Sequence, residues 1–301
     1  MALTDRGFAA RLRAVHPIIL SGSVCLLWSS AFLSGRIALR ESDPFIVAGV
    51  RQMLAAFATW GLLSFWGYRL SLIPITASYV TFFLLDVVML HGFTLLGISL
   101  LPAGVGAGLL YIYPVFTTVL AIIVLKERVR RRFWVSLFLA AAGVVLISRV
   151  GAQGFRLGHL AFLIAALSWA ASTTLFKRAR LGEDIVSLQI WSMFLGGAVL
   201  AAIALIIGEG HIEPSVSFFL ALAWLVIPAG AVAMVLWYTA LSVLPAHRAS
   251  FSLVPVPFLT LFFGRLILGE PITWSGFIGI VCVTVGLLVL PRRRARSAPL
   301  T

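Results

Sequence analysis

The chain has few charged residues and few of the residues that mark secreted or metal-binding proteins. Of its 301 residues only 11% are charged, 10 are acidic, 2 are cysteines and none is asparagine. The missing asparagine excludes N-glycosylation, and Cys25 and Cys282 lie apart in apolar runs without the spacing of a metal site. Soluble globular proteins carry about 25% charged residues. A cytoplasmic enzyme, a secreted domain and a disordered tail are therefore excluded.

What the chain does have is apolar sequence in long runs. It is 61% hydrophobic, with a mean hydropathy of +1.08, and a membrane-spanning helix needs about 20 such residues. We expect an all-α integral membrane protein without a sizeable domain outside the bilayer. Its apolar runs, separated by charges and turn residues, predict ten transmembrane helices, over residues 17–39, 44–66, 76–97, 102–125, 132–149, 158–178, 185–207, 216–240, 245–268 and 273–290.

The basic residues predict the orientation of these helices. With the N-terminus in the cytoplasm, the outer connections hold only Arg40, Arg149 and Arg156 of the 23 lysines and arginines. This asymmetry places both termini in the cytoplasm, so the net charge of +13 reflects topology and contact with anionic lipids instead of nucleic-acid binding. The excess of arginine over lysine is typical of a GC-rich bacterial genome, and the expected location is the bacterial inner membrane.

The chain contains an internal repeat. A shift of 141 residues aligns Trp28 with Trp169, and a shift of 143 aligns Leu101-Pro102-Ala103 with Leu244-Pro245-Ala246, Pro114 with Pro257 and Glu127 with Glu270. We therefore expect a first repeat over 17–149 and a second over 150–290, between a cytoplasmic segment (1–16) and a basic tail (291–301).

The number of helices in each repeat carries a functional meaning. A duplicated unit of five helices inserts in opposite orientations, so the two repeats are predicted to be inverted around a central cavity. Inverted repeats are typical of secondary transporters, which bind substrate near the midplane and expose it to each side in turn.

The repeat also resembles a known domain. The stretches Leu27-Trp28-Ser29-Ser30-Ala31-Phe32, 44–51 and 113–128 are similar to the EamA domain, and residues 253–257 and 268–271 belong to its second copy. Two such domains cover nearly the whole chain, as in the ten-helix drug/metabolite transporter superfamily. The resemblance implies a basket of helices and, for many bacterial members, export of amino acids and related metabolites. Other members import vitamins, nucleosides or cofactors such as riboflavin or S-adenosylmethionine.

Polar side chains inside the helices are candidate functional groups, since they are costly in hydrocarbon. Asp86 and His91 are five residues apart, which in an α-helix separates them by about 140°. His91 and Tyr111 each lie ten residues from Leu101, at a matching depth of about 15 Å. We expect His91 and Tyr111 to face the cavity and bind substrate by hydrogen bonds, with a histidine satisfied inside the core as the alternative.

Asp86 and Arg51 are the two charged candidates for a binding role inside the predicted spans. Asp86 is a candidate for proton coupling, for neutralising Arg51 or a cationic substrate, or for a structural hydrogen bond. Arg51 is a candidate for binding a substrate carboxylate; the alternatives are that it extends to the outer surface or pairs with Glu41 or Asp43.

Aromatic, proline and glutamate residues complete the candidates. Trp28, Trp169 and Tyr238 are predicted to stack on substrate, with helix packing or an interfacial position as alternatives. Pro114, Pro255 and Pro257 are predicted to kink their helices in mid-course and so act in gating. The glutamates that follow these helices, Glu127 and Glu270, are predicted to cap the helix that comes next.

The chain lacks motifs for enzymatic chemistry. It contains no H-E-x-x-H, G-x-S-x-G or Walker A sequence, so we expect no enzyme, no cofactor and no bound metal. The expected function is export of an amino acid, an amine or an amino-acid-derived opine or metallophore by alternating access, with import of a vitamin, nucleoside or cofactor as the alternative. The expected partners are a small-molecule substrate, membrane lipids and a proton or solute counter-gradient, for a monomer or a homodimer.

Overall fold

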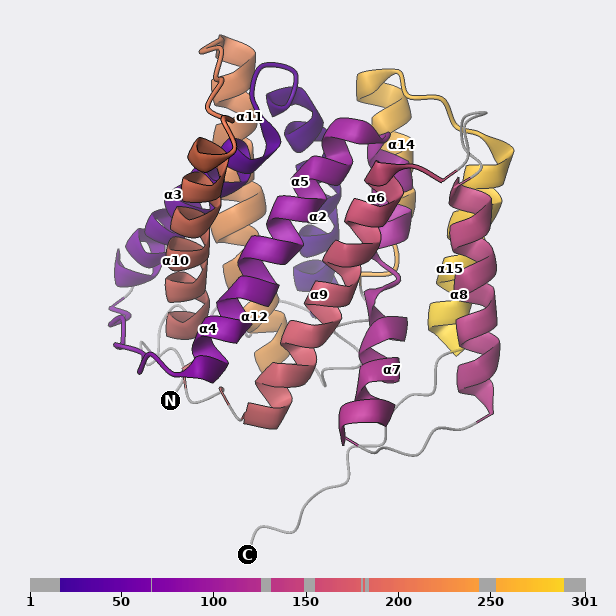
Figure 1. Cartoon of the computed structure of the whole chain (residues 1–301), viewed down its shortest axis with the longest axis horizontal. Helices are drawn as coiled ribbons and strands as arrows, with labels where there is room; N and C mark the ends of the chain where they lie inside the picture. Colours follow the sequence, from indigo (N-terminus) through magenta and orange to yellow (C-terminus); the bar gives the residue numbers. More distant parts are fainter. Residues whose placement is uncertain are drawn as a thin grey trace, which may run out of the picture.

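The computed structural model is a bundle of helices (Figure 1). It describes residues 17–65, 67–125, 131–148, 155–179, 181, 184–243 and 253–289. Its helices are α2 (Pro17–Ala38), α3 (Pro44–Phe65), α4 (Ala77–Phe83), η1 (Leu84–Met89), α5 (Leu90–Leu100), α6 (Ala103–Leu110), α7 (Tyr113–Leu125), α8 (Arg132–Ser148), α9 (Leu157–Ala179), α10 (Ile185–Ile206), α11 (Val216–Val226), η2 (Ile227–Val232), α12 (Ala233–Val243), α14 (Val256–Leu268) and α15 (Trp274–Val289).

The helices have the length and composition of a membrane protein. Within the described ranges, six helical stretches are long and apolar enough to cross a bilayer, and three shorter apolar helices accompany them. The prediction of an all-helical membrane protein is therefore confirmed. Each of the ten predicted ranges contains helix, and the count of ten complete spans stays a prediction.

Two loops from different parts of the chain are joined at one end of the bundle, called here the Asp43 side. The Asp43 Oδ2 atom accepts hydrogen bonds from the backbone N–H groups of Gly210 and His211, both at 3.0 Å. Hydrogen bonds from Ser215 and Ser217 hold the Glu41 carboxylate and lower its pKa. Both acids thus fix the loop before α11, and neither pairs with Arg51 as one prediction proposed.

The opposite end of the bundle, called here the Tyr68 side, holds a second connection between the segments that flank α3 and α10. The Tyr68 hydroxyl donates to Asp184 Oδ1 at 2.7 Å, and Ser187 Oγ accepts from the backbone N–H of Ser71 at 2.9 Å. Trp191 Nε1 donates to the Ser71 carbonyl at 3.0 Å. Since α3 leads into Tyr68 and α10 begins after Asp184, α3 and α10 are joined at both ends.

Between these ends, α3 and α10 cross with their backbones in contact. A Cβ atom on Gly49 would lie 2.6 Å from the Ala201 backbone nitrogen, and one on Gly197 would lie 2.9 Å from the Gly49 carbonyl oxygen. A second crossing joins α8 to α15, where a Cβ atom on Gly143 would lie 2.6 Å from the Gly279 carbonyl oxygen. Small residues permit such close approach between helices in a membrane. Figure 1 shows α8 and α15 as a pair at one edge.

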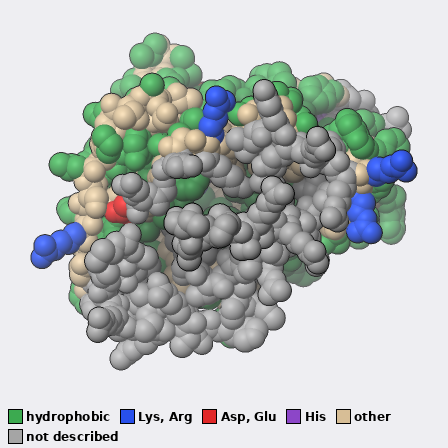
Figure 2. Space-filling model, turned by 90° about the horizontal axis from the view of Figure 1, so that it is seen from below, with side chains coloured by type: hydrophobic (Ala, Val, Ile, Leu, Met, Phe, Trp, Pro, Cys, Tyr) green, Lys and Arg blue, Asp and Glu red, His purple; other side chains and the backbone are tan. Residues whose placement is uncertain are grey.

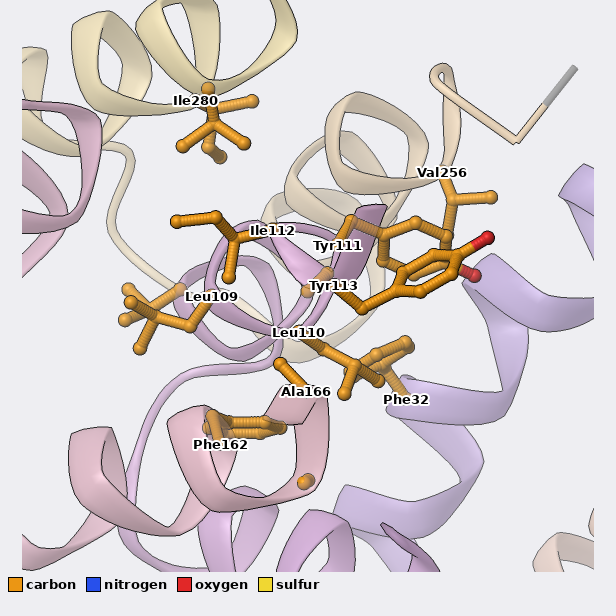
Figure 3. Close-up of a cluster of buried hydrophobic side chains, with 14 of the residues drawn as sticks. Phe32, Leu109, Leu110, Tyr111, Ile112, Tyr113, Phe162, Ala166, Val256 and Ile280 are labelled. Atoms are coloured by element: carbon orange, nitrogen blue, oxygen red, sulfur yellow. The ribbon is translucent and has the colours of Figure 1, made fainter. Parts of the chain in front are cut away.

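The central core packs the first repeat against α9. The Phe162 ring is fully buried and fills the space left by Gly97 and Gly106, and it stacks near Phe32 with ring centroids 6.4 Å apart. Figure 3 shows this ring below Leu110 of α6. Because a larger residue than glycine would collide with the ring, α5, α6 and α9 have one close packing arrangement.

The Tyr68 side of the molecule is the one predicted to face the cytoplasm. Figure 2 shows this side, with lysine or arginine side chains at its edge and hydrophobic side chains around them. Such an edge is typical of the level of lipid headgroups, and the orientation stays a prediction.

We expect Gly49→Ala to destabilise the protein by about 2 kcal/mol, because the added methyl group meets backbone atoms that cannot turn aside. Gly61→Ala is the matched control in the same helix, where a Cβ atom has nothing within 4 Å. Denaturation by SDS of protein purified in detergent micelles measures both variants. Equal stability of the two would contradict the close crossing.

We expect Asp184→Ala to cost about 1 kcal/mol, because Asp184 caps α10 by accepting from the Ser187 N–H at 3.1 Å. Burial raises the pKa of this carboxyl, but hydrogen bonds from Ser187, Tyr68 and Ser71 lower it by a larger amount. The net effect is a decrease in the pKa. The stabilising effect is therefore present above the ordinary pKa of about 3.9 and is lost as the pH falls through the lower native value.

Thermal unfolding in detergent at pH 7 and at pH 3 tests this expectation. The difference between wild type and Asp184→Ala is expected to shrink at the lower pH. A constant difference would show that the carboxylate charge contributes nothing.

Candidate functional site

A basic pair joins α3 to α5 in the middle of the bundle. Arg51 Nη2 lies 2.7 Å from His91 Nδ1. A guanidinium group has only donors, so His91 Nδ1 accepts this bond and the neutral imidazole carries its proton on Nε2. The Arg51 Nε atom is buried and has no hydrogen-bond partner. Arg51 thus keeps an unused donor inside the bundle.

No carboxylate neutralises Arg51 in the part of the chain that the structure describes. There the only ion pair joins His211 to Glu213, both exposed on the Asp43 side. The predicted alternative in which Asp86 neutralises Arg51 is therefore wrong. A buried cation without a counter-ion is costly, and an anionic ligand would remove this cost.

Asp86 has partners from two other helices. Its Oδ1 atom accepts a hydrogen bond from Ser172 Oγ of α9 at 2.8 Å, and its Oδ2 atom accepts one from Gln189 Nε2 of α10 at 3.2 Å. Ser172 and Gln189 are buried and neutral. These two donors orient the carboxyl group but leave it without a cation among the described residues.

The helix that carries Asp86 and His91 is widened between them. Residues Leu84–Met89 form the π-helical segment η1, in which the Leu90 N–H donates to the Leu85 carbonyl five residues earlier. Such a segment places one extra residue in a helical turn. The predicted separation of about 140° assumed a regular α-helix and is therefore wrong.

Neighbouring contacts show the corrected register. A Cβ atom on Gly92 would meet Leu200 of α10, and Val87, five residues before Gly92, occupies the space beside Gly196. Gly196 and Leu200 are one turn apart on α10, so residues five apart across η1 face the same neighbour. By the same register, Asp86 and His91 lie on one face, about one helical turn apart.

A small pocket adjoins the acidic group. It lies between α3, α10 and α12, and Gln189, which donates to Asp86, is part of its wall. The lining is otherwise nearly all apolar and consists of Thr59, Leu63, Val186, Ile190, Met193, Met234 and Val235. Val186 begins α10 and Leu63 is near the end of α3, so the pocket lies between Asp86 and the Tyr68 side.

Tyr111 and Trp169 lie together in an aromatic cluster. Tyr113 stacks on Trp169 with ring centroids 3.8 Å apart and planes 16° apart, and Tyr111 meets Trp169 edge to face at 6.0 Å. Tyr111 is only 4% exposed, and Figure 3 shows its hydroxyl pointing with that of Tyr113 away from Leu109. His91 contacts Arg51 instead of this cluster, so the structure gives Tyr111 and His91 different partners.

The other predicted aromatic residues lie elsewhere. Trp28 of α2 packs on Trp237 of α12, with ring centroids 5.4 Å apart. Trp28 and Trp169, which the repeat aligns, therefore have different aromatic neighbours. Tyr238 belongs to α12, and its side chain lies outside the described part of the structure.

The prolines follow helix breaks instead of lying in mid-helix as predicted. The helix before Pro114 ends at Leu110, and the next begins at Tyr113. In the second repeat Pro255 is the N-cap of α14 and Pro257 lies in its first turn. Proline suits a first helical turn because no partner exists there for its missing N–H. Their role in gating stays a prediction.

Glu270 caps a different helix from the one predicted. Both of its carboxylate oxygens lie 3.0 Å from the backbone nitrogen of Ala103, the first residue of α6. The chain turns back through Gly269, whose φ of +68° is left-handed, so Glu270 faces the first repeat. Thr273 caps α15 in its place. Glu127 lies outside the described residues.

Three residues of the site were not predicted from the sequence. Ser172, Gln189 and Tyr113 contact Asp86 or Trp169, yet each is an ordinary residue for a membrane helix. Only Tyr113 had a local signal, its position two residues after Tyr111 and directly before Pro114. The partners of Asp86 come from α9 and α10, about a hundred residues away along the chain.

Several known proteins are similar along nearly the full length of the chain. The transporter YoaV of Bacillus subtilis, of uncharacterised function, is 25% identical over 276 residues, covering 89% of this chain and 94% of that protein. A probable amino-acid metabolite efflux pump of Escherichia coli is 25% identical over 287 residues, covering 90% and 93%. The uncharacterised inner membrane transporter YedA of E. coli is 26% identical over 279 residues, covering 89% and 90%.

Comparison with solved structures and with protein families identifies the fold and the family. One crystal structure superposes with a TM-score of 0.68 at 18% identity, covering 91% of this chain and 95% of that one, which shows a shared fold. The family model of EamA-like transporters matches residues 17–149 and again 156–291. The chain is a membrane transporter that belongs to the EamA-like transporter family.

Proposed function

We propose that this transporter exports a small amino-acid-like metabolite across the bacterial inner membrane by alternating access. The observation that carries the proposal is the Arg51 guanidinium, which has a buried and unpartnered Nε atom in the middle of the bundle. A guanidinium binds a carboxylate with two parallel hydrogen bonds. The carboxylate of an amino acid would supply the missing partner and the missing negative charge.

The relatives support the cargo and the direction. Among them, proteins of Escherichia coli and Salmonella typhimurium are named probable amino-acid metabolite efflux pumps. At 25% identity these names suggest a cargo class without specifying a compound. The chain contains no Walker A sequence, so the proposed energy source is a proton or solute gradient.

The duplicated architecture supports alternating access. The family model matches the chain twice, and both repeats share two unusual features at a shift of 143 residues: the π-helical segments η1 and η2, and the helix starts at Tyr113 and Val256. In the proposal, ten spans form two inverted repeats, and both termini lie in the cytoplasm. Two copies of one unit in opposite orientations can open a shared cavity to either side by equivalent motions.

Transport in proteoliposomes tests the proposal. Vesicles containing the purified chain and loaded with a mixture of unlabelled amino acids are expected to take up labelled amino acids by counterflow. Arg51→Gln is expected to weaken apparent affinity about ten- to a hundredfold, as loss of a charged hydrogen bond costs about 1.5–3 kcal/mol. Arg265→Gln, a change on the exposed end of α14, is the control and should transport normally.

The direction is tested in cells. A deletion strain fed with dipeptides is expected to retain the corresponding amino acids and release less into the medium, as measured by mass spectrometry. Loss of uptake of a vitamin or nucleoside, without amino-acid retention, would favour import and refute the export proposal.

A further inference from the structure

We infer that the site binds an α-amino acid as a zwitterion, with the ammonium group at Asp86 and the carboxylate at Arg51. The inference rests on the proposed function and makes it more specific. It assigns separate parts of the substrate to two charged residues that do not contact each other.

The π-helical segment η1 aligns Asp86 with the basic pair Arg51 and His91. In a regular α-helix, Asp86 and His91 would point in different directions, and the acid could not act on the same ligand as the basic pair. The register seen at Val87 and Gly92 places Asp86 and His91 on one face, one helical turn apart. His91 holds Arg51 at 2.7 Å. An acidic and a basic group thus follow each other along the bundle.

Asp86 and Arg51 each lack a partner of opposite charge among the described residues. Within the described residues, Asp86 receives hydrogen bonds only from neutral Ser172 and Gln189. Arg51 has neutral His91 as its partner and an unused Nε donor. Among the described residues no ion pair connects Asp86 with Arg51. A ligand that carries both charges would neutralise both groups at once, whereas an amine or a carboxylic acid alone would leave one charge unpaired.

Arg51 and Asp86 lie at different heights along the bundle. Arg51 lies in α3 seven residues after Pro44, which is on the Asp43 side, and Asp86 lies closer to Ala77, where α4 begins on the Tyr68 side. The substrate carboxylate would therefore point toward the Asp43 side and its ammonium group toward the Tyr68 side.

The second repeat has a π-helical segment at the same position but without the charged residues. The residues that follow Asp86 and His91 by 143 positions are Ala229 and Met234, and the π-helical segment recurs there as η2. Met234 belongs to the pocket wall. The pair of charged groups is therefore present once, which predicts one amino acid per transport cycle.

Three probes of matched shape test the inference in proteoliposomes. They are L-leucine, 4-methylpentanoate, which lacks the ammonium group, and 3-methylbutylamine, which lacks the carboxylate. Each is used unlabelled to inhibit counterflow of labelled leucine. With the wild-type chain, we expect both analogues to inhibit at least tenfold more weakly than leucine.

The variants separate the two ends of the substrate. Asp86→Asn is expected to weaken leucine at least tenfold and leave inhibition by 4-methylpentanoate unchanged, since that analogue has no ammonium group to lose. Arg51→Gln is expected to weaken leucine and leave 3-methylbutylamine unchanged. Glu213→Gln, an exposed acid on the Asp43 side, is the control. For variants with little transport, leucine and its analogues are compared by thermal shift of the purified protein in detergent.

Other results would overturn the inference. Equal weakening of leucine and 4-methylpentanoate by Asp86→Asn, or no effect on leucine, would show that Asp86 does not bind the ammonium group, while the proposed export would stand. Absence of counterflow and of thermal shift with every amino acid would refute the proposed function as well.

Discussion

The structure depends on helices whose backbones touch in a medium that offers no water. At Gly49 and Gly197, and again at Gly143 and Gly279, the absence of a side chain lets one helix lie directly against another. Apolar side chains gain little by packing together in lipid, since lipid tails are equally apolar, so close fit supplies much of the cohesion. Each crossing joins a helix of the first repeat to one of the second. The two repeats are therefore held together at these crossings, and the one at Gly49 lies two residues from Arg51.

The same constraint gives the polar side chains their value. α3 and α10 are joined at the Asp43 side and at the Tyr68 side, so this pair forms a fixed wall. Arg51 and Gln189 project from that wall, while Asp86 and His91 belong to the neighbouring helix. A charged group held against a rigid wall keeps its geometry when other helices move. This arrangement suits a binding site that is exposed first to one side and then to the other.

The sequence was sufficient to predict the fold class and the repeat because both depend on patterns that extend over many residues. Apolar runs extend along the whole chain, and Pro114 recurs as Pro257 at the repeat distance of 143 residues. It was not sufficient for local geometry. A π-helical turn has no composition of its own, and the assumption of a regular helix put Asp86 and His91 on different faces. Glu270 was assigned to the helix beside it in sequence, whereas Gly269 turns it toward α6.

The site residues show the same division. Arg51, Asp86 and His91 could be selected because charge is rare in these helices, and rarity is visible in sequence. Their partners could not be assigned, because Ser172 and Gln189 are small or neutral polar residues like many others in the bundle. Which pairs form depends on how α9 and α10 rotate about their axes, and close contacts such as those of Gly97 and Gly196 set that rotation.

The two repeats therefore share a backbone and differ in chemistry. Both contain a π-helical segment at equivalent positions, and both contain a helix that starts just before a proline. The π-helical segment η2, where Ala229 stands in place of the acid, cannot serve to position a charge. Its common role in the two repeats must be geometric: it changes the register of a helix within the bundle without breaking it. The first repeat then uses this register to align an acid with a basic pair. The binding chemistry thus rests on a backbone feature that the duplicated fold has in both halves.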